Sequence, residues 1–199
     1  EATMVGELTN PHIVQVLDYG RLEDGRVYLA MEYLEGESLQ AMLARLGRVS
    51  VDQTIDVLLQ ACEALGEAHS LGYVHRDLRP KNLFLARRAT ASNFLKVLDF
   101  GLAKAVDLTH TAANTTLGLT FGDPRYMSPE QAKGLAVDQR SDLYQLGCVA
   151  YEMLTGAPPF HGAGVFEVLA KHATEAPSPL AVHRPDVPAA LEAVILRLL

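Results

Sequence analysis

The sequence predicts an α+β fold, with short strands near its start and long helices after residue 50. Two runs rich in β-branched and aromatic residues, 13–17 and 27–33, are typical of strands, and Asp24-Gly25 between them indicates a tight turn. We therefore expect a β-hairpin. After residue 50, apolar residues recur at helical spacing, which favours a mainly helical remainder.

The first helices are expected on either side of residue 50. A short helix is predicted over about 38–46, after the break at Glu35-Gly36. Ser50 and Gln53 have the spacing of a capping box, in which each side chain satisfies a backbone donor of a helix that begins there. That helix is predicted to bury one apolar stripe and to end at Gly72; the stripe consists of Ile55, Leu58, Leu59, Cys62 and Leu65.

The remainder of the chain predicts two short strands followed by helices. The strands cover 83–85 and 95–98, and the loop between them, 86–94, is longer than a tight hairpin needs. Residues 107–122 are rich in threonine and aperiodic, which indicates a loop. A deeply buried helix is expected over about 143–154, ending at Gly156, with further helices over 165–173 and 188–199.

Composition excludes several classes of protein. A net charge of −7 argues against a nucleic-acid partner, which would require clustered Lys and Arg. No window of about 18 uncharged apolar residues predicts a membrane span, and the first residues lack the basic head and apolar run of a signal peptide. Cys62 and Cys148 are too few for a disulfide framework, so buried free thiols in a reducing cytoplasm are expected.

The chemistry is carried by His75-Arg76-Asp77-Leu78-Arg79-Pro80-Lys81-Asn82 and, further on, by Asp99-Phe100-Gly101. Asn82 and Asp99 can supply the hard oxygen ligands that Mg²⁺ prefers. Asp77 is then available to accept a proton from an incoming hydroxyl.

With the later Ser128-Pro129-Glu130, the order and spacing of these motifs resemble those of the eukaryotic-like protein kinase family. The segment 126–131, Tyr-Met-Ser-Pro-Glu-Gln, is most similar to that of bacterial Ser/Thr kinases, and the resemblance covers essentially the whole chain. It implies a protein-kinase-like fold, with a partial N-lobe over 1–33 (one helix and two strands) and a mostly helical C-lobe over 34–199.

The resemblance also implies roles for individual residues. Asp77 would act as the base and Asn82 and Asp99 as ligands of Mg²⁺ or Mn²⁺. ATP would meet Met31 as gatekeeper, the hinge residues Glu32, Tyr33 and Leu34, and Phe84 beneath the adenine. Arg76 would bind a phosphorylated Thr115 or Thr116, and Asp142 would bond the backbone of the catalytic loop. His75, Phe100, Val5 and Val16 match the apolar column that couples the two lobes.

The sequence also departs from the family pattern. Glu1 matches the helix glutamate that pairs with the family's lysine, but neither that lysine nor a Gly-rich loop occurs in the chain, and an arginine partner for Glu130 is also missing. The chain is therefore expected to be truncated at both ends and inactive alone. Arg79 stands where lysine is usual and Asp123 where threonine is usual, and we hypothesise that these two form a charge-assisted pair beside Asp77.

The leading interpretation is a fragment of a Ser/Thr protein kinase that transfers the γ-phosphate of Mg-ATP to proteins, including its own activation loop. A kinase–kinase dimer for trans-phosphorylation is compatible with this, as is a membrane anchor elsewhere in the full-length protein. The alternative is a pseudokinase or a non-catalytic docking module that uses the C-lobe. A small-molecule phosphotransferase is disfavoured by Ser128-Pro129-Glu130, which builds the peptide shelf in protein kinases.

Overall fold

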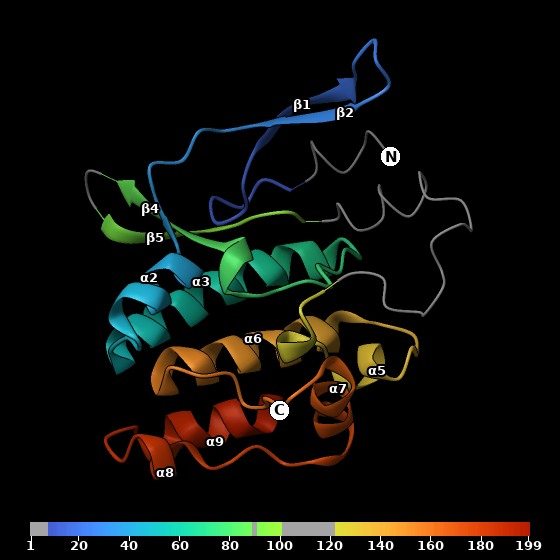
Figure 1. The fold of residues 1–199 in the computed structure, drawn as a ribbon. Coiled ribbons are helices and arrows are strands. Elements are labelled where there is room, and N and C mark those ends of the chain that lie inside the picture. Colours follow the sequence, from blue (N-terminus) through green and yellow to red (C-terminus); the bar gives the residue numbers. More distant parts are fainter. Residues whose placement is uncertain (1–7, 89–90, 101–121) are drawn as a thin grey trace.

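The computed structural model describes residues 8–88, 91–100 and 122–199. A two-stranded hairpin projects from one end, a small sheet lies below it, and helices make up the rest (Figure 1). The predicted α+β fold is confirmed. The boundary at residue 34 between two lobes stays a prediction.

The predicted hairpin is present but begins later than expected. Strand β1 covers Val16–Arg21 and pairs antiparallel with β2, Val27–Met31. The turn is closed by the N–H of Leu22, which donates to the carbonyl of Arg26 at 2.8 Å. Ile13 and Val14 do not join this hairpin. Both are buried, and Ile13 lies opposite Val97 of the other sheet in a bridge made by the N–H of Val14 and the carbonyl of His12.

The second sheet has the strand order β3–β4–β5 and is antiparallel throughout. Its strands are β3 Gly36–Ser38, β4 Leu83–Arg88 and β5 Ala91–Val97. The expected long loop over 86–94 is wrong, since the backbone pairing of β4 with β5 extends outward as far as Arg88 and Ala91. Leu83, Leu95 and Val97 bury the inner face of this sheet.

Side-chain caps define the starts of the first two helices. Helix α2, Leu39–Leu46, is capped by Ser38, whose hydroxyl accepts from the N–H of Ala41. Helix α3, Val51–Ser70, begins at the predicted capping box, with both the Ser50 and the Gln53 bonds formed. The chain leaves α3 through Gly72, as predicted, whose N–H donates to the carbonyl of His69.

The predicted buried stripe of α3 is confirmed at Leu65 and in part at Leu58, which packs against the core, but it is wrong for its other three residues. Ile55, Leu59 and Cys62 are exposed, whereas the buried residues are Thr54, Val57, Ala61, Ala64, Leu65 and Ala68. Three alanines on this face let α3 approach helix α6 closely, and larger side chains are turned outward. Cys62 is accordingly an exposed free thiol, while Cys148 is buried as expected.

Helix α6, Gln139–Thr155, is the centre of the helical part and is buried over most of its length, as predicted. Figure 1 shows it between α3 and α9, Ala189–Leu198. The short α5, Pro129–Ala132, and α8, Leu180–His183, also pack against it, and α7, Val165–Thr174, packs against α5. Among the described residues, no helix is long and apolar enough to cross a membrane.

Candidate active site

One buried carboxylate of helix α6 binds the backbone of the loop 75–82. Asp142, in the first turn of α6 and fully buried, accepts hydrogen bonds from the backbone N–H groups of His75 and Arg76, both at 2.8 Å. His69 Nε2 lies 2.8 Å from the same carboxylate. The predicted contact between Asp142 and the loop backbone is confirmed. These bonds hold Arg76 at φ 69°, a conformation that non-glycine residues rarely adopt.

Two glutamines that the sequence analysis did not single out complete this support. Gln145 of α6 accepts from the N–H of Leu78 at 2.7 Å and donates to the carbonyl of Arg76 at 2.9 Å. Gln131 of α5 donates to the same carbonyl at 2.7 Å. The signal for Gln145 was available, because it is an amide in a helix predicted to be deeply buried, and buried polar groups are normally hydrogen-bonded.

The structure brings the two motifs together at Asn82. Its side-chain amide donates to the backbone carbonyl of Asp77 at 2.8 Å and to the Asp77 carboxylate at 3.2 Å. Its backbone carbonyl accepts from the N–H of Leu98 at 2.9 Å, so Asp99 follows directly beside the loop. Asp99 has a φ of 62°, which turns the chain sharply where β5 ends.

His75 and Phe100 pack beside this junction. The His75 Nε2 lies 2.8 Å from the carbonyl of Leu98, and the two rings meet edge-on at a centroid distance of 4.8 Å. Two members of the predicted apolar column, His75 and Phe100, are therefore in contact, whereas the contribution of Val16, at the start of β1, stays a prediction. Val5 lies outside the described residues.

The Asp77 carboxylate is partly buried, and burial raises its pKa. Arg79, His75 and the hydrogen bond from Asn82 oppose this rise, whereas Asp123 adds to it. Arg79 Nε lies 3.2 Å from Asp77 Oδ2 without the alignment of a hydrogen bond. Arg79 thus faces the predicted base directly.

The hypothesised pair between Arg79 and Asp123 is wrong. Asp123 instead binds Arg125, two residues later, through Nε at 2.9 Å and Nη2 at 2.5 Å. The reason is local, because Asp123 also caps the short 3₁₀ turn Pro124–Tyr126 by accepting from the backbone N–H of Arg125. Burial would raise the pKa of Asp123, but these bonds from Arg125 outweigh it and lower the pKa.

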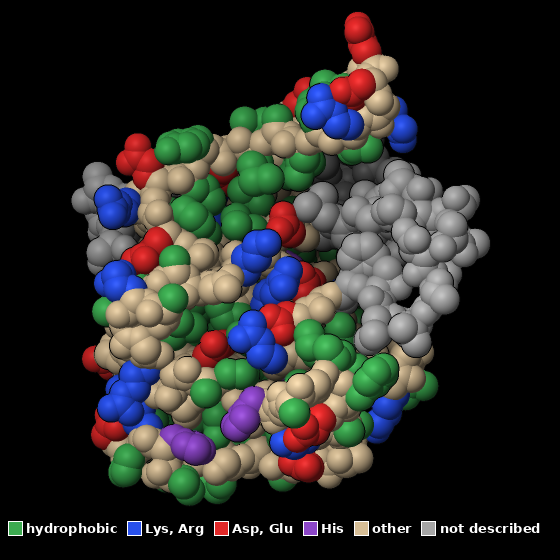
Figure 2. Space-filling model, viewed as in Figure 1, with side chains coloured by type: hydrophobic (Ala, Val, Ile, Leu, Met, Phe, Trp, Pro, Cys, Tyr) green, Lys and Arg blue, Asp and Glu red, His purple; other side chains and the backbone are tan. Residues whose placement is uncertain are grey.

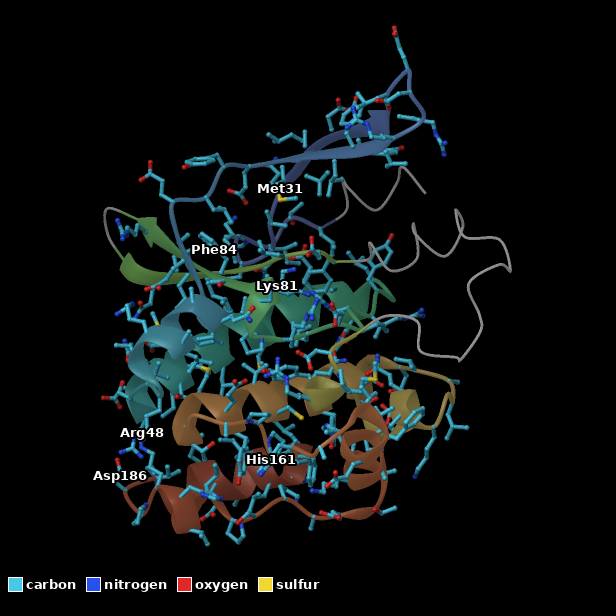
Figure 3. The ribbon with its side chains drawn as sticks, in the orientation of Figure 1. Met31, Arg48, Lys81, Phe84, His161 and Asp186 are labelled. Carbon is cyan, nitrogen blue, oxygen red and sulfur yellow. The ribbon has the colours of Figure 1, made fainter. Side chains whose placement is uncertain are left out.

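The predicted hinge lies between the hairpin and the small sheet. Figure 3 shows Met31 above Phe84, with Lys81 below them. The Glu32 side chain pairs with Lys96 of β5 at 2.5 Å, and the N–H of Glu32 donates to the carbonyl of Gln15 at 2.9 Å. Tyr33 is 88% exposed and Leu34 is half-buried.

A pocket of about 290 Å³ opens beside the loop 75–82. It is bounded by α2, the loop, the 3₁₀ turn 124–126 and the end of α6. Arg79, Lys81, Asp123, Arg125 and Glu152 are its charged lining residues. Arg79 connects this pocket to Asp77.

The remaining predicted residues fall into two groups. Glu1, Thr115 and Thr116 lie outside the described residues. Glu130, in α5, is described, and its carboxylate accepts from the hydroxyl of Ser141. The Nε of Arg76 is buried and has no hydrogen-bond partner in the described part of the chain.

The donor set fits a hard divalent ion better than a soft one. Asn82 offers an amide oxygen and Asp99 a carboxylate, and both are of the type that Mg²⁺ and Mn²⁺ prefer. Within residues 8–88, 91–100 and 122–199, no group of three or more His, Cys, Asp or Glu side chains could hold a metal unaided. An ion here therefore calls for further oxygen ligands, such as the phosphates of a nucleotide.

Comparison with known proteins agrees with this geometry. A family model described as "Protein kinase domain" matches residues 1–189. Over the whole chain, the sequence is 41% identical to the serine/threonine-protein kinase pkn3 and 44% identical to Pkn1, both of Myxococcus xanthus, and 39% identical to PknB of Mycolicibacterium smegmatis. The chain belongs to the protein kinase family.

The chain spans 37%, 28% and 32% of the lengths of these three relatives. Protein kinases in general use ATP with a divalent metal ion and act on protein substrates.

Proposed function

We propose that this chain carries the catalytic residues of a serine/threonine protein kinase, which transfers the γ-phosphate of Mg-ATP to hydroxyl groups of proteins. The observation that supports this most is the double role of Asn82. Its amide binds the Asp77 carboxylate, and its carbonyl binds the residue before Asp99. A base and two oxygen ligands thereby share one small region.

Asp77 would orient the substrate hydroxyl and accept its proton. Burial raises the pKa of this carboxyl, which makes it a stronger base than an exposed aspartate. Asn82 and Asp99 would hold Mg²⁺ or Mn²⁺, and the bound ion would neutralise charge on the phosphates. The amide bonds of Asn82 to Asp77 would keep base and ligand in a fixed relation.

Arg79 would contact the transferred phosphate in place of the usual lysine. Because Asp123 is bound by Arg125, Arg79 is not diverted to Asp123. Its guanidinium next to Asp77 offers several donors in a planar arrangement suited to phosphate oxygens. The departure from the family pattern at position 79 is thus compatible with catalysis.

The adenine would lie between Met31 and Phe84, against the backbone of the hinge. The backbone N–H of Leu34 makes no hydrogen bond to the described residues and is a suitable donor to a purine nitrogen. The N–H of Glu32 is used by Gln15. Tyr33 would remain at the solvent edge, consistent with its exposure.

Regulation would act through Arg76. A phosphate on Thr115 or Thr116 carries about −1.5 to −2 charges and would pair with this arginine, whose Nε is buried without a partner among the described residues. Phosphorylation by a second copy of the kinase would supply that phosphate. Separately, Glu1 would pair with the family's lysine. The unpaired thiols of Cys62 and Cys148 are compatible with a cytoplasmic location.

The test is transfer of radiolabelled phosphate from ATP by the protein that carries these residues, with phosphoamino-acid analysis of the product. We expect phosphoserine or phosphothreonine, and a loss of about 100-fold or more in Asp77→Asn, the range of general-base catalysis. Asp52→Asn, an exposed carboxylate in the first turn of α3, is the matched control and should retain activity. Equal incorporation by the wild type and Asp77→Asn would instead favour the non-catalytic docking module.

A further inference from the structure

The pocket beside Asp77 has an unusual balance of charge for a surface that must accept a protein chain. Three cations line it, Arg79, Lys81 and Arg125, against two carboxylates, Asp123 and Glu152. Figure 2 shows Lys and Arg side chains gathered in the middle of this face, and Figure 3 shows Lys81 projecting there.

Both carboxylates are occupied within the pocket wall. Asp123 accepts two hydrogen bonds from Arg125. Glu152 is half-buried and accepts from the hydroxyl of Tyr126 at 2.5 Å. The charge of Asp123 is therefore paired with Arg125, and Glu152 is held by Tyr126 through one of its two oxygens.

Two cations of the pocket, Lys81 and Arg79, make fewer hydrogen bonds to the described residues than its carboxylates do. Lys81 is exposed and makes no ion pair with any described residue. Arg79 faces Asp77, but its Nε lacks a well-aligned hydrogen bond. Lys81 thus gives the pocket an unpaired positive charge at its rim, toward which an anion would be attracted.

We propose that this pocket binds an acidic side chain, Asp or Glu, of the protein substrate. The inference rests on the proposed kinase function and specifies its substrate class. The anion would sit against Lys81, with Arg125 as a second donor, while the acceptor hydroxyl approaches Asp77.

The reach of the chain limits where the acidic residue lies. Lys81 follows Asp77 by four residues, a separation of at most roughly 14 Å. An extended substrate covers that distance in about four residues. The acidic side chain therefore falls within about four positions of the phosphorylated residue.

The experiment compares peptides that share one acceptor serine in a neutral background and carry a single Glu, Gln or Lys at each position within four residues of it. For the best position, we expect the KM of the Glu peptide to be about 5- to 30-fold lower than that of the Gln peptide, which corresponds to about 1–2 kcal/mol. Lys81→Glu should abolish this preference and favour the Lys peptide. Lys133→Glu makes the same change of charge on an exposed lysine away from the pocket and should keep the preference.

A second measurement does not depend on turnover. Binding of the same labelled peptides to the Asp77→Asn protein, followed by fluorescence anisotropy, should show the same order of affinity. If no peptide is phosphorylated above the Asp77→Asn background but the Glu peptide still binds best, the proposed function fails and the acidic site stands. If peptides bind without regard to charge, or if Lys81→Glu raises the KM for ATP and leaves the peptide KM unchanged, the acidic site is refuted.

Discussion

Asp142→Asn tests whether one buried carboxylate organises the catalytic loop. Asp142 is fully buried and accepts from two backbone N–H groups and approaches the ring of His69. Asparagine keeps one acceptor oxygen, but its NH₂ group would face one of these backbone N–H groups, so that two donors meet. Hydrogen bonds to charged groups contribute about 1.5–3 kcal/mol each, and breaking a buried ionic network costs about 3–5 kcal/mol.

We expect Asp142→Asn to lower the free energy of unfolding by about 3–5 kcal/mol. Urea denaturation followed by circular dichroism measures this. At an m-value of about 2 kcal/mol per molar urea, the midpoint should fall by roughly 1.5–2.5 M. Activity should also drop, because Asp77 follows Arg76, whose rare backbone conformation depends on the lost bond.

Asp52→Asn removes the same charge from an exposed site and controls for net charge. Its cost should stay below about 1 kcal/mol, the contribution of a carboxylate near a helix N-terminus. Equal urea midpoints for Asp142→Asn and Asp52→Asn would refute the assignment of Asp142 as the anchor of the loop.

Two further predictions concern pH and backbone space. Burial lowers the pKa of His172 from 6.5 to about 4, so the folded state favours the neutral ring, and its contribution to stability is complete above pH 6.5 and is lost as the pH falls toward 4. Over that window the free energy of unfolding should fall by about 3 kcal/mol. In His172→Gln, the free energy of unfolding measured between pH 7 and 4 should decline less steeply than in the wild type; parallel curves for the two proteins would contradict this. Gly36→Ala would put a Cβ 2.1 Å from the carbonyl oxygen of Leu85, at a φ of +150°, so β3 must separate from β4. The control is Gly47→Ala, at a residue with a φ of +76° but open space around it. The melting temperature of Gly36→Ala should be well below that of the control. Similar melting temperatures for the two alanine variants would show that the β3–β4 contact is not essential.

Features fixed by local chemistry were predicted well from sequence. The capping box at Ser50 depends on residues three apart and appears as expected. The cost of an unpaired buried charge indicated that Asp142 needs a partner, and the family resemblance implied that this partner is the backbone of the loop. The placement of Asp99 beside Asp77 and Asn82 needed the family resemblance, because Asp99 lies on a separate segment.

Features that depend on competing partners could not be predicted. On α3, helical spacing allowed more than one apolar face, and close packing against α6 selected the alanines, leaving Ile55 and Leu59 exposed. For Asp123, complementary charge pointed to Arg79, but Arg125 is tied to Asp123 by the 3₁₀ turn and binds it first. Sequence spacing does not rank two arginines of the same charge; local backbone geometry does.

The buried ammonium of Lys96 has a consequence for how the β1–β2 hairpin can move relative to β5. It contacts the Ile13 carbonyl before β1 and the Glu32 carboxylate after β2, so a single side chain fastens both ends of the hairpin to β5. Asp99 lies three residues further along that same segment. Any rocking of the hairpin must therefore pull on β5 or break this ion pair, which couples the hairpin mechanically to the segment that carries Asp99.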